Sequence, residues 1–233
     1  MADLKDPKII IFSLLAGVVP AVIWLIFWLR EDKERPEPRG LVFLTFVLGM
    51  ISVVFVLPLE KIAKNSITDT TLLIIVLASL EELIKYGATW LIALKSAFVN
   101  EPIDFPMYFI TAALGFAALE NALFLIHPLA IDQTVVGLLT GSLRYLGATL
   151  LHAISSGIIG IAMGLAFFSS RFTKAVYVFF GLITAIALHS TFNFFIMENA
   201  GENYLTIFGF LWVVTVIVFL LLEKLRRMSQ ITS

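Results

Sequence analysis

Three ionisable side chains, Glu81, Glu82 and Lys85, lie within five consecutive residues of an apolar stretch. The flanking residues 72–78 and 88–94 are mostly apolar, so the whole stretch is long enough to cross a bilayer as a helix. An ionisable side chain near the centre of a bilayer costs roughly 2.5–3.5 kcal/mol. Lys85 follows Glu82 by three residues and Glu81 by four, which permits an ion pair along one helix face. Taken alone, these residues fit either a structural ion pair or part of a reactive site.

Further ionisable residues interrupt three later apolar stretches, at Glu120, His152 and His189. Two of the three histidines of the chain therefore lie inside stretches that are typical of membrane-spanning helices. With the orientation argued below and a rise of 1.5 Å per residue, Glu81 and these three residues all lie roughly 9–15 Å from the same membrane face. Lone structural polar residues have no reason to share a depth, so the sequence predicts that the four meet in one site.

Two carboxylates and two imidazoles form a set that can bind a divalent metal ion. Zinc takes histidine nitrogen and glutamate oxygen, and a catalytic zinc site leaves one position open for water. The candidate zinc ligands are Glu81, Glu120, His152 and His189. The alternative is a buried glutamate that acts as general base on water without a metal. Both alternatives predict hydrolysis, with water admitted from the outer membrane face. Asn193 follows His189 by one helical turn and can donate a hydrogen bond to a developing oxyanion.

The composition is that of a polytopic membrane protein. The 233 residues are 60% hydrophobic and 14% charged, and the mean hydropathy is +0.99. We therefore expect an all-α fold, a helical bundle that forms a single integral membrane domain over residues 1–233. The net charge of -1 gives no indication of a nucleic-acid partner, and the absence of cysteine excludes disulfides and thiolate chemistry. The chain has no His-Glu-x-x-His motif, which excludes that zinc-peptidase pattern.

About seven membrane-spanning helices are predicted from apolar runs of about 20 residues. Their approximate ranges are 9–29, 41–59, 71–94, 107–126, 137–168, 175–197 and 204–222. Residues 137–144 are a candidate for a separate entry segment before the fifth helix. Lysine and arginine are concentrated in the loops on the side that also holds the C-terminus, which predicts a cytoplasmic C-terminus and an external N-terminus.

Four short motifs on successive predicted helices, taken in order, resemble the PrsW family of intramembrane proteases. The residues that carry the resemblance are Glu81-Glu82-x-x-Lys85, Phe116-x-x-x-Glu120-Asn121, His152-x-x-x-Ser156 and His189-x-x-x-Asn193. The resemblance covers a core of about residues 70–197. It implies a bacterial, multi-pass plasma-membrane endopeptidase acting in regulated proteolysis. Its substrate would be a membrane-anchored protein, such as an anti-sigma factor, cut on the outer side of the membrane.

The same resemblance implies roles for individual residues. Glu81 would be the water-activating carboxylate with Glu82 as its partner. His152 and His189 would be metal ligands or acids, and Asn193 would be the oxyanion donor. In the related CAAX prenyl endopeptidases a histidine replaces Glu120 and an arginine lies one position beyond Lys85, so prenylated substrates are not expected here. Zinc is favoured over the metal-free glutamate mechanism because two histidines and two glutamates exceed what a lone general base needs.

A proton- or ion-coupled transporter is the alternative function, since buried Glu, His and Lys side chains also form proton relays. Such carriers more often have paired spans broken by Gly or Pro, whereas here Pro58 is near a span end and Pro20 lies in the first span, away from the polar residues. Other polar positions have simpler interpretations. Ser155 and the Gly160-x-x-x-Gly164 pair are expected to serve helix packing. His127 is expected at the interface, and Arg144 is expected either to pair with Glu120 or Glu82 or to reach the outer interface. The oligomeric state is left open.

Overall fold

The computed structural model describes residues 6–31, 35–130, 134–198 and 204–230, and it consists of helices and their connections. The elements are α1 (Pro7–Trp28), a short 3₁₀ turn η1 (Leu29–Glu31), α2 (Arg39–Ser66), α3 (Thr70–Ile92), α4 (Asp104–Ala130), α5 (Thr134–Leu165), α6 (Arg171–Glu198) and α7 (Tyr204–Gln230). No strand occurs in these ranges, which confirms the predicted all-α class. The side chains of His127 and Arg144 lie outside the described part of the structure, and so do the predictions made for them.

Six of the helices are long and apolar enough to cross a membrane, as judged over the described residues. The chain is therefore a multi-pass membrane protein, as predicted. The seventh, α3, has 23 residues but is not among the six. Its middle third carries Glu81, Glu82 and Lys85, so every bilayer-length window of α3 contains three ionisable groups.

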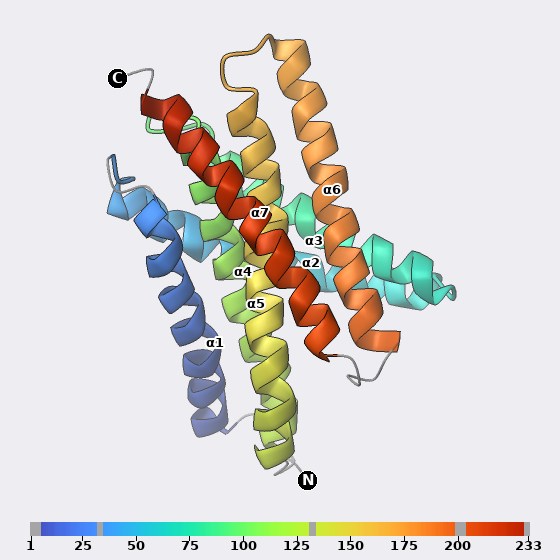
Figure 1. The fold of residues 1–233 in the computed structure, drawn as a ribbon. Coiled ribbons are helices and arrows are strands. Elements are labelled where there is room, and N and C mark those ends of the chain that lie inside the picture. The colour runs from blue at the N-terminus through green and yellow to red at the C-terminus, as the bar shows by residue number, and fades with distance from the viewer. Residues whose placement is uncertain (1–5, 32–34, 131–133, 199–203, 231–233) are drawn as a thin grey trace.

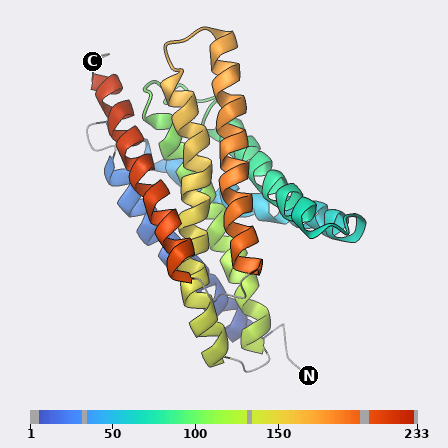
Figure 2. The ribbon, with the colours of Figure 1, turned by 45° about the vertical axis from the view of Figure 1, so that its right-hand side comes forward.

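α4 and α5 lie at the centre of the bundle, and α1, α6 and α7 stand around them (Figure 1). α2 and α3 form a hairpin that is strongly inclined to the other helices and extends away from the bundle (Figure 2). α4 packs against α1, α2 and α5, whereas α3 packs mainly against α2 and α6. The start of α1 and the end of α7 lie at opposite ends of the bundle (Figure 1), an arrangement compatible with termini on opposite sides of a membrane.

Three boundaries differ clearly from the sequence prediction, and one of them is the end of α7, which continues to Gln230 instead of ending at residue 222. Residues 137–144 do not form a separate entry segment, because α5 is one continuous helix of 32 residues. α2 continues to Ser66, about two turns past the predicted end at residue 59. The added turns are polar, with an ion pair of 3.0 Å between Lys64 Nζ and Glu60 Oε2. Helix formation there needs no further apolar residues, so hydropathy alone does not reveal it.

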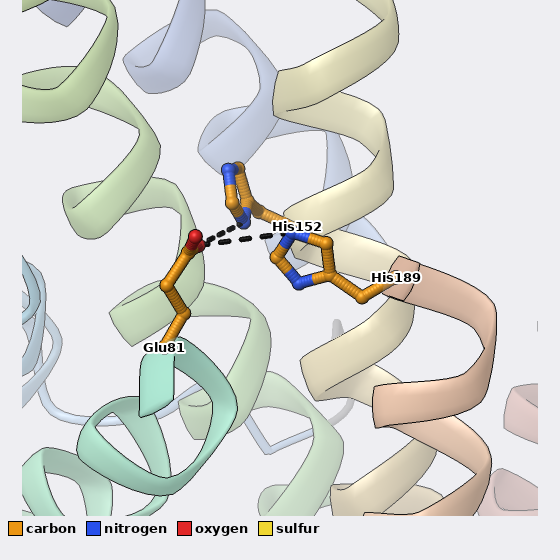
Figure 3. Close-up of side chains that lie close together, drawn as sticks. All are labelled: Glu81, His152 and His189. Carbon is orange, nitrogen blue, oxygen red and sulfur yellow. Dashed lines mark ion pairs between the residues drawn. The ribbon is translucent and has the colours of Figure 1, made fainter. Parts of the chain in front are cut away.

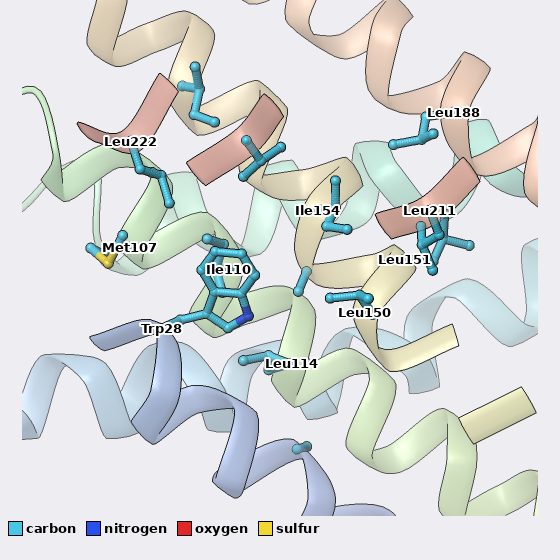
Figure 4. Close-up of a cluster of buried hydrophobic side chains, with 14 of the residues drawn as sticks. Trp28, Met107, Ile110, Leu114, Leu150, Leu151, Ile154, Leu188, Leu211 and Leu222 are labelled. Carbon is cyan, nitrogen blue, oxygen red and sulfur yellow. The ribbon is translucent and has the colours of Figure 1, made fainter. Parts of the chain in front are cut away.

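Apolar side chains from six helices fill the centre of the bundle (Figure 4). The core residues labelled in that view are Trp28, Met107, Ile110, Leu114, Leu150, Leu151, Ile154, Leu188, Leu211 and Leu222. Together they hold α4, α5 and α6 in fixed positions, and these helices supply most of the polar groups described below.

Glycines set the closest approaches of α4 to its neighbours. A Cβ atom on Gly115 would lie 2.0 Å from the Phe46 carbonyl oxygen of α2. On α5, a Cβ atom on Gly160 would lie 2.5 Å from Pro106 Cα. A Cβ atom on Gly164 would lie 2.4 Å from the Pro102 carbonyl oxygen. Backbones can approach this closely only where no side chain intervenes. The predicted packing role of Gly160 and Gly164 is thus confirmed.

Candidate active site

Three predicted site residues from three helices converge inside the bundle. α3 supplies Glu81, α5 supplies His152 and α6 supplies His189 (Figure 3). Glu81 Oε2 lies 3.9 Å from His152 Nδ1 and 3.7 Å from His189 Nε2. All three side chains are buried, and one ligand atom from each lies within 4.8 Å of the other two. The structure thus brings together three side chains that are far apart in the sequence.

The donor set fits a divalent metal ion. Glu81 Oε2 is buried and accepts no hydrogen bond from any described residue. A buried carboxylate oxygen without a partner is costly, and a cation or a polarised water molecule is what such an oxygen lacks. One carboxylate and two imidazoles are also the three protein ligands of a common type of catalytic zinc site. Glu81, His152 and His189 therefore have the chemistry that such an ion requires.

Glu82 is adjacent in sequence but faces a different environment. Its side chain is completely buried, and it accepts hydrogen bonds on both oxygens. Oε1 accepts from His189 Nδ1 at 2.8 Å and from Ser155 Oγ at 3.0 Å, and Oε2 accepts from Ser156 Oγ at 2.8 Å. By occupying Nδ1 of His189, Glu82 directs Nε2 of the same ring towards Glu81.

Lys85 is the fourth partner of Glu82 and is also completely buried. Its Nζ atom lies 2.5 Å from Glu82 Oε1, so the ion pair forms at the i,i+3 spacing. The same Nζ atom lies 3.0 Å from His152 Nδ1 and 4.9 Å from the centre of the Phe116 ring. The ammonium group therefore connects α3 with α5.

Glu120 contacts the opposite side of the His152 ring. Its Oε2 atom lies 2.8 Å from His152 Nε2, and its side chain is 34% exposed. It does not belong to the group of three that converge on Glu81 Oε2. In this structure Glu120 is therefore placed to orient His152, between the ring and a cavity.

A cavity of about 520 Å³ lies beside these residues. Its polar lining comprises Glu60, Lys64, Glu81, Glu120, Asn121, His152, His189 and Asn193. These residues come from the C-terminal parts of α2, α4 and α6, from the N-terminal half of α3 and from the middle of α5. The cavity thus reaches from the middle of α5 towards the ends of α2, α4 and α6 that the sequence predicts to be external. Asn193 shares the cavity with Glu81, as the proposed oxyanion donor must.

Two hydroxyl groups at the site were not assigned from the sequence. Ser155 was predicted to serve packing only, and this was wrong, because its Oγ donates to Glu82. Ser156, for which the sequence leaves open either helix packing or the orientation of a ligand, donates to the other Glu82 oxygen. Both follow His152 by about one helical turn, so their position on its face was a usable signal.

A helical membrane protein with a buried carboxylate–imidazole site at a polar cavity has the architecture of an intramembrane hydrolase. Comparison with known protein families narrows this class. Residues 37–222 match the model of the PrsW family, described as intramembrane metalloproteases. That match covers most of the chain, so the protein belongs to this family and is a membrane peptidase.

Curated relatives agree with the family assignment. The chain is 28% identical over 200 residues to Protease PrsW of Geobacillus kaustophilus, covering 83% of this chain and 84% of the relative. It is 26% identical over 202 residues to Protease PrsW of Bacillus subtilis, covering 84% of this chain and 89% of that relative. It is 24% identical over 227 residues to Protease PrsW of Shouchella clausii, covering 94% and 97%. No solved structure matches. The family assignment favours the peptidase over the transporter considered above.

Proposed function

We propose that the protein hydrolyses a peptide bond of a membrane-anchored protein close to the extracytoplasmic face, with Glu81 as the water-activating carboxylate. One observation carries this proposal. Glu81 Oε2 is buried without a hydrogen-bond donor, faces one nitrogen from each site histidine, and belongs to a residue that lines the polar cavity. Because Glu81 lines the cavity, a water molecule there lies beside its carboxylate, and a desolvated carboxylate is an effective general base.

Glu81, His152 and His189 are the residues that would hold a zinc ion. A bound zinc ion would supply Lewis acidity that polarises the scissile carbonyl and lowers the pKa of water. Glu120 was predicted as a fourth ligand, and we propose instead that it orients the His152 ring through Nε2. Glu82, which does not line the cavity and accepts a hydrogen bond from His189, is proposed to position that histidine rather than to touch the substrate.

Two residues of the chain then have separate roles in the reaction. Glu81 takes a proton from the attacking water, whose oxygen forms a bond to the carbonyl carbon. Asn193 donates a hydrogen bond to the developing oxyanion. The bond between carbon and nitrogen breaks as Glu81 returns the proton to the leaving amine. One water molecule is consumed, and the products are a carboxylic acid and an amine, which become carboxylate and ammonium when the acid proton passes to the amine.

The substrate class follows from the position of the site. The cavity lies between the helices, towards their predicted external ends, and α2 and α3 supply part of its lining, so a substrate must itself be held in or against the membrane. With the predicted external N-terminus, this end of the bundle faces away from the cytoplasm. A membrane-anchored anti-sigma factor is the substrate that the family resemblance implies, and its cleavage would make the enzyme part of a regulated proteolytic pathway.

The test is a comparison of protein N-termini in membranes from a bacterial host that expresses either the wild type or Glu81→Gln. Glu223→Gln is the matched control, because Glu223 pairs only with α7 arginines in the described structure. We expect new N-termini in the wild type and the control, located just outside the membrane in single-span proteins and absent with Glu81→Gln. New termini that persist in Glu81→Gln would overturn the role of Glu81, and termini on the cytoplasmic side would overturn the orientation.

Metal use is tested separately by elemental analysis of purified protein. We expect about one zinc ion per chain in the wild type, and loss of that zinc in the double variant His152→Ala/His189→Ala. A wild type that cleaves its substrate without any bound metal would instead establish the metal-free glutamate mechanism.

A further inference from the structure

Lys85 is a buried cation in the middle of the site, yet the hydrolysis described above does not use it. Its side chain is completely buried in the bundle and does not belong to the cavity lining. Its ammonium group lies within hydrogen-bond distance of Glu82 Oε1 and of His152 Nδ1. The ion pair between Lys85 and Glu82 does not require a contact between Lys85 and His152, so the contact with the histidine calls for its own explanation.

The contact determines which nitrogen of His152 carries the proton. An ammonium group has three hydrogen-bond donors and no acceptor, so His152 Nδ1 must accept. The other nitrogen, Nε2, faces Glu120 Oε2 at 2.8 Å, and a carboxylate oxygen accepts. His152 is therefore held with its proton on Nε2.

His189 is held in the opposite tautomer. Its Nδ1 atom faces Glu82 Oε1 at 2.8 Å, and Glu82 is ion-paired with Lys85. Since the carboxylate accepts, Nδ1 of His189 carries the proton. The lone pair of Nε2 is then left to point towards Glu81 Oε2, at 3.7 Å.

We propose that Lys85 is a positioning residue that takes up the Nδ1 lone pair of His152 and so holds the two site histidines in opposite tautomers. The proton lies on Nε2 in His152 and on Nδ1 in His189. The buried Lys85–Glu82 pair sets both tautomers at once, the ammonium through His152 and the carboxylate through His189. The inference concerns the arrangement of hydrogen bonds in the resting site and does not depend on whether Glu81 activates water.

One consequence concerns the metal set. His152 Nδ1 is the atom of that ring that lies nearest to Glu81 Oε2 among the contacts described, at 3.9 Å, and Lys85 occupies its lone pair. Only His189 then offers a free ring lone pair to the shared centre. Lys85 therefore competes with any metal ion for His152 Nδ1, and it has to release that atom before the atom can bind a metal.

The experiment is magic-angle-spinning NMR at neutral pH on metal-free protein in lipid bilayers, with only the histidines labelled with ¹⁵N and ¹³C. The chain has three histidines, so at most six ring nitrogens give signals. Protonated and unprotonated nitrogens resonate apart, and coupling to the ring carbons tells Nδ1 from Nε2. His127→Gln and His152→Gln assign the three rings.

In the wild type we expect His152 to be protonated at Nε2 only and His189 at Nδ1 only. In Lys85→Met we expect a second His152 species protonated on Nδ1, because Glu81 Oε2 then becomes an available acceptor for that proton. His189 should keep its wild-type signals. Lys85→Gln, which retains an N–H donor on a side chain one atom shorter, should restore the single His152 species in part.

Thr89→Val is the matched control on α3, because Thr89 is equally buried and its hydroxyl donates to the Lys85 carbonyl oxygen. It should leave all histidine signals in place. Two results would overturn the proposal: wild-type histidines protonated on the same nitrogen, or a His152 spectrum in Lys85→Met identical to that of the wild type. The wild-type spectrum alone decides the first point, so the proposal stays testable even if Lys85→Met fails to fold.

Discussion

The site has two halves that begin at adjacent residues and have opposite characters. The closed half consists of Glu82, Lys85, Ser155 and Ser156, and every carboxylate oxygen in it accepts hydrogen bonds. The open half consists of Glu81 and the cavity beside it, and the Glu81 Oε2 atom accepts none from the described residues. The two histidines lie between the halves.

This contrast shows how a membrane protein can keep one reactive carboxylate. A charge buried in a bilayer needs partners, and the closed half provides them within protein alone. The open half provides no such partner for Glu81 Oε2, so this oxygen is available to a water molecule or a cation. We therefore expect substitutions in the closed half to affect stability and substitutions in the open half to affect the reaction.

Glu81→Gln should show the largest effect. We expect the cleavage rate to fall about 10²–10⁴-fold, because an amide cannot take a proton from water. The unfolding free energy should not fall, since the substitution removes a buried charge whose oxygen Oε2 has no donor. Cleavage of the substrate found by N-terminal analysis, together with unfolding in mixed micelles, provides the two measurements. Wild-type activity in this variant would remove the distinction between the halves.

Glu82→Gln should have the opposite profile. It leaves the buried Lys85 ammonium without its counter-charge, and breaking a buried ion pair on one side costs about 3–5 kcal/mol of unfolding free energy. The measurement is the same unfolding experiment, with Glu223→Gln as the control for a partly exposed glutamate. If Glu82→Gln unfolds like the wild type but cleaves far more slowly, then Glu82 belongs to the open half.

Asn193→Ala tests whether this residue of the cavity lining is the oxyanion donor. Loss of an oxyanion donor typically lowers kcat about 10²–10³-fold, and we expect a decrease of this order with little change in KM. Asn193 is only half-buried, so the unfolding free energy should stay close to that of the wild type. A rise in KM with unchanged kcat would assign Asn193 to substrate binding instead.

Ser156→Ala should show the smallest effect. The substitution removes the hydroxyl that donates to Glu82 Oε2 at 2.8 Å, and leaving a buried acceptor short of a donor costs about 1–3 kcal/mol of unfolding free energy. Ser156→Thr keeps a hydroxyl and should recover most of the loss. Equal stability of Ser156→Ala and the wild type would show that the closed half does not depend on this hydrogen bond.

Much of the fold and part of the site could be predicted from the sequence. Apolar runs located all seven helices, because membrane helices are fixed mainly by length and composition. The shared depth of the ionisable residues placed Glu81, His152 and His189 together, and the structure has them within one group. Depth along a helix follows from residue counting, which explains this agreement.

Rotation about the helix axis could not be predicted in the same way. Glu120 has the right depth but meets His152 from the other side of the ring, outside the group around Glu81 Oε2. Lys85 was compatible with a pair to either glutamate, and only the placement of α5 and α6 selects Glu82. The inclination of the α2–α3 hairpin likewise depends on close glycine contacts, such as Gly115 against Phe46, which hydropathy does not encode.

The polar middle of α3 also has a consequence for how the protein is made. Two hydrogen-bond partners of Glu82 follow it at a long distance in the chain: His189 lies 107 residues later and Ser155 lies 73 residues later. At the usual speed of synthesis, the interval before His189 emerges is roughly 5–20 s. During that time α3 has to remain in or near the insertion machinery with its ion pair to Lys85 as its main internal compensation. Assembly of the site is therefore the step that completes membrane insertion of α3, so a variant that cannot form the closed half should be recognised first as a poorly inserted protein and only then as an inactive one.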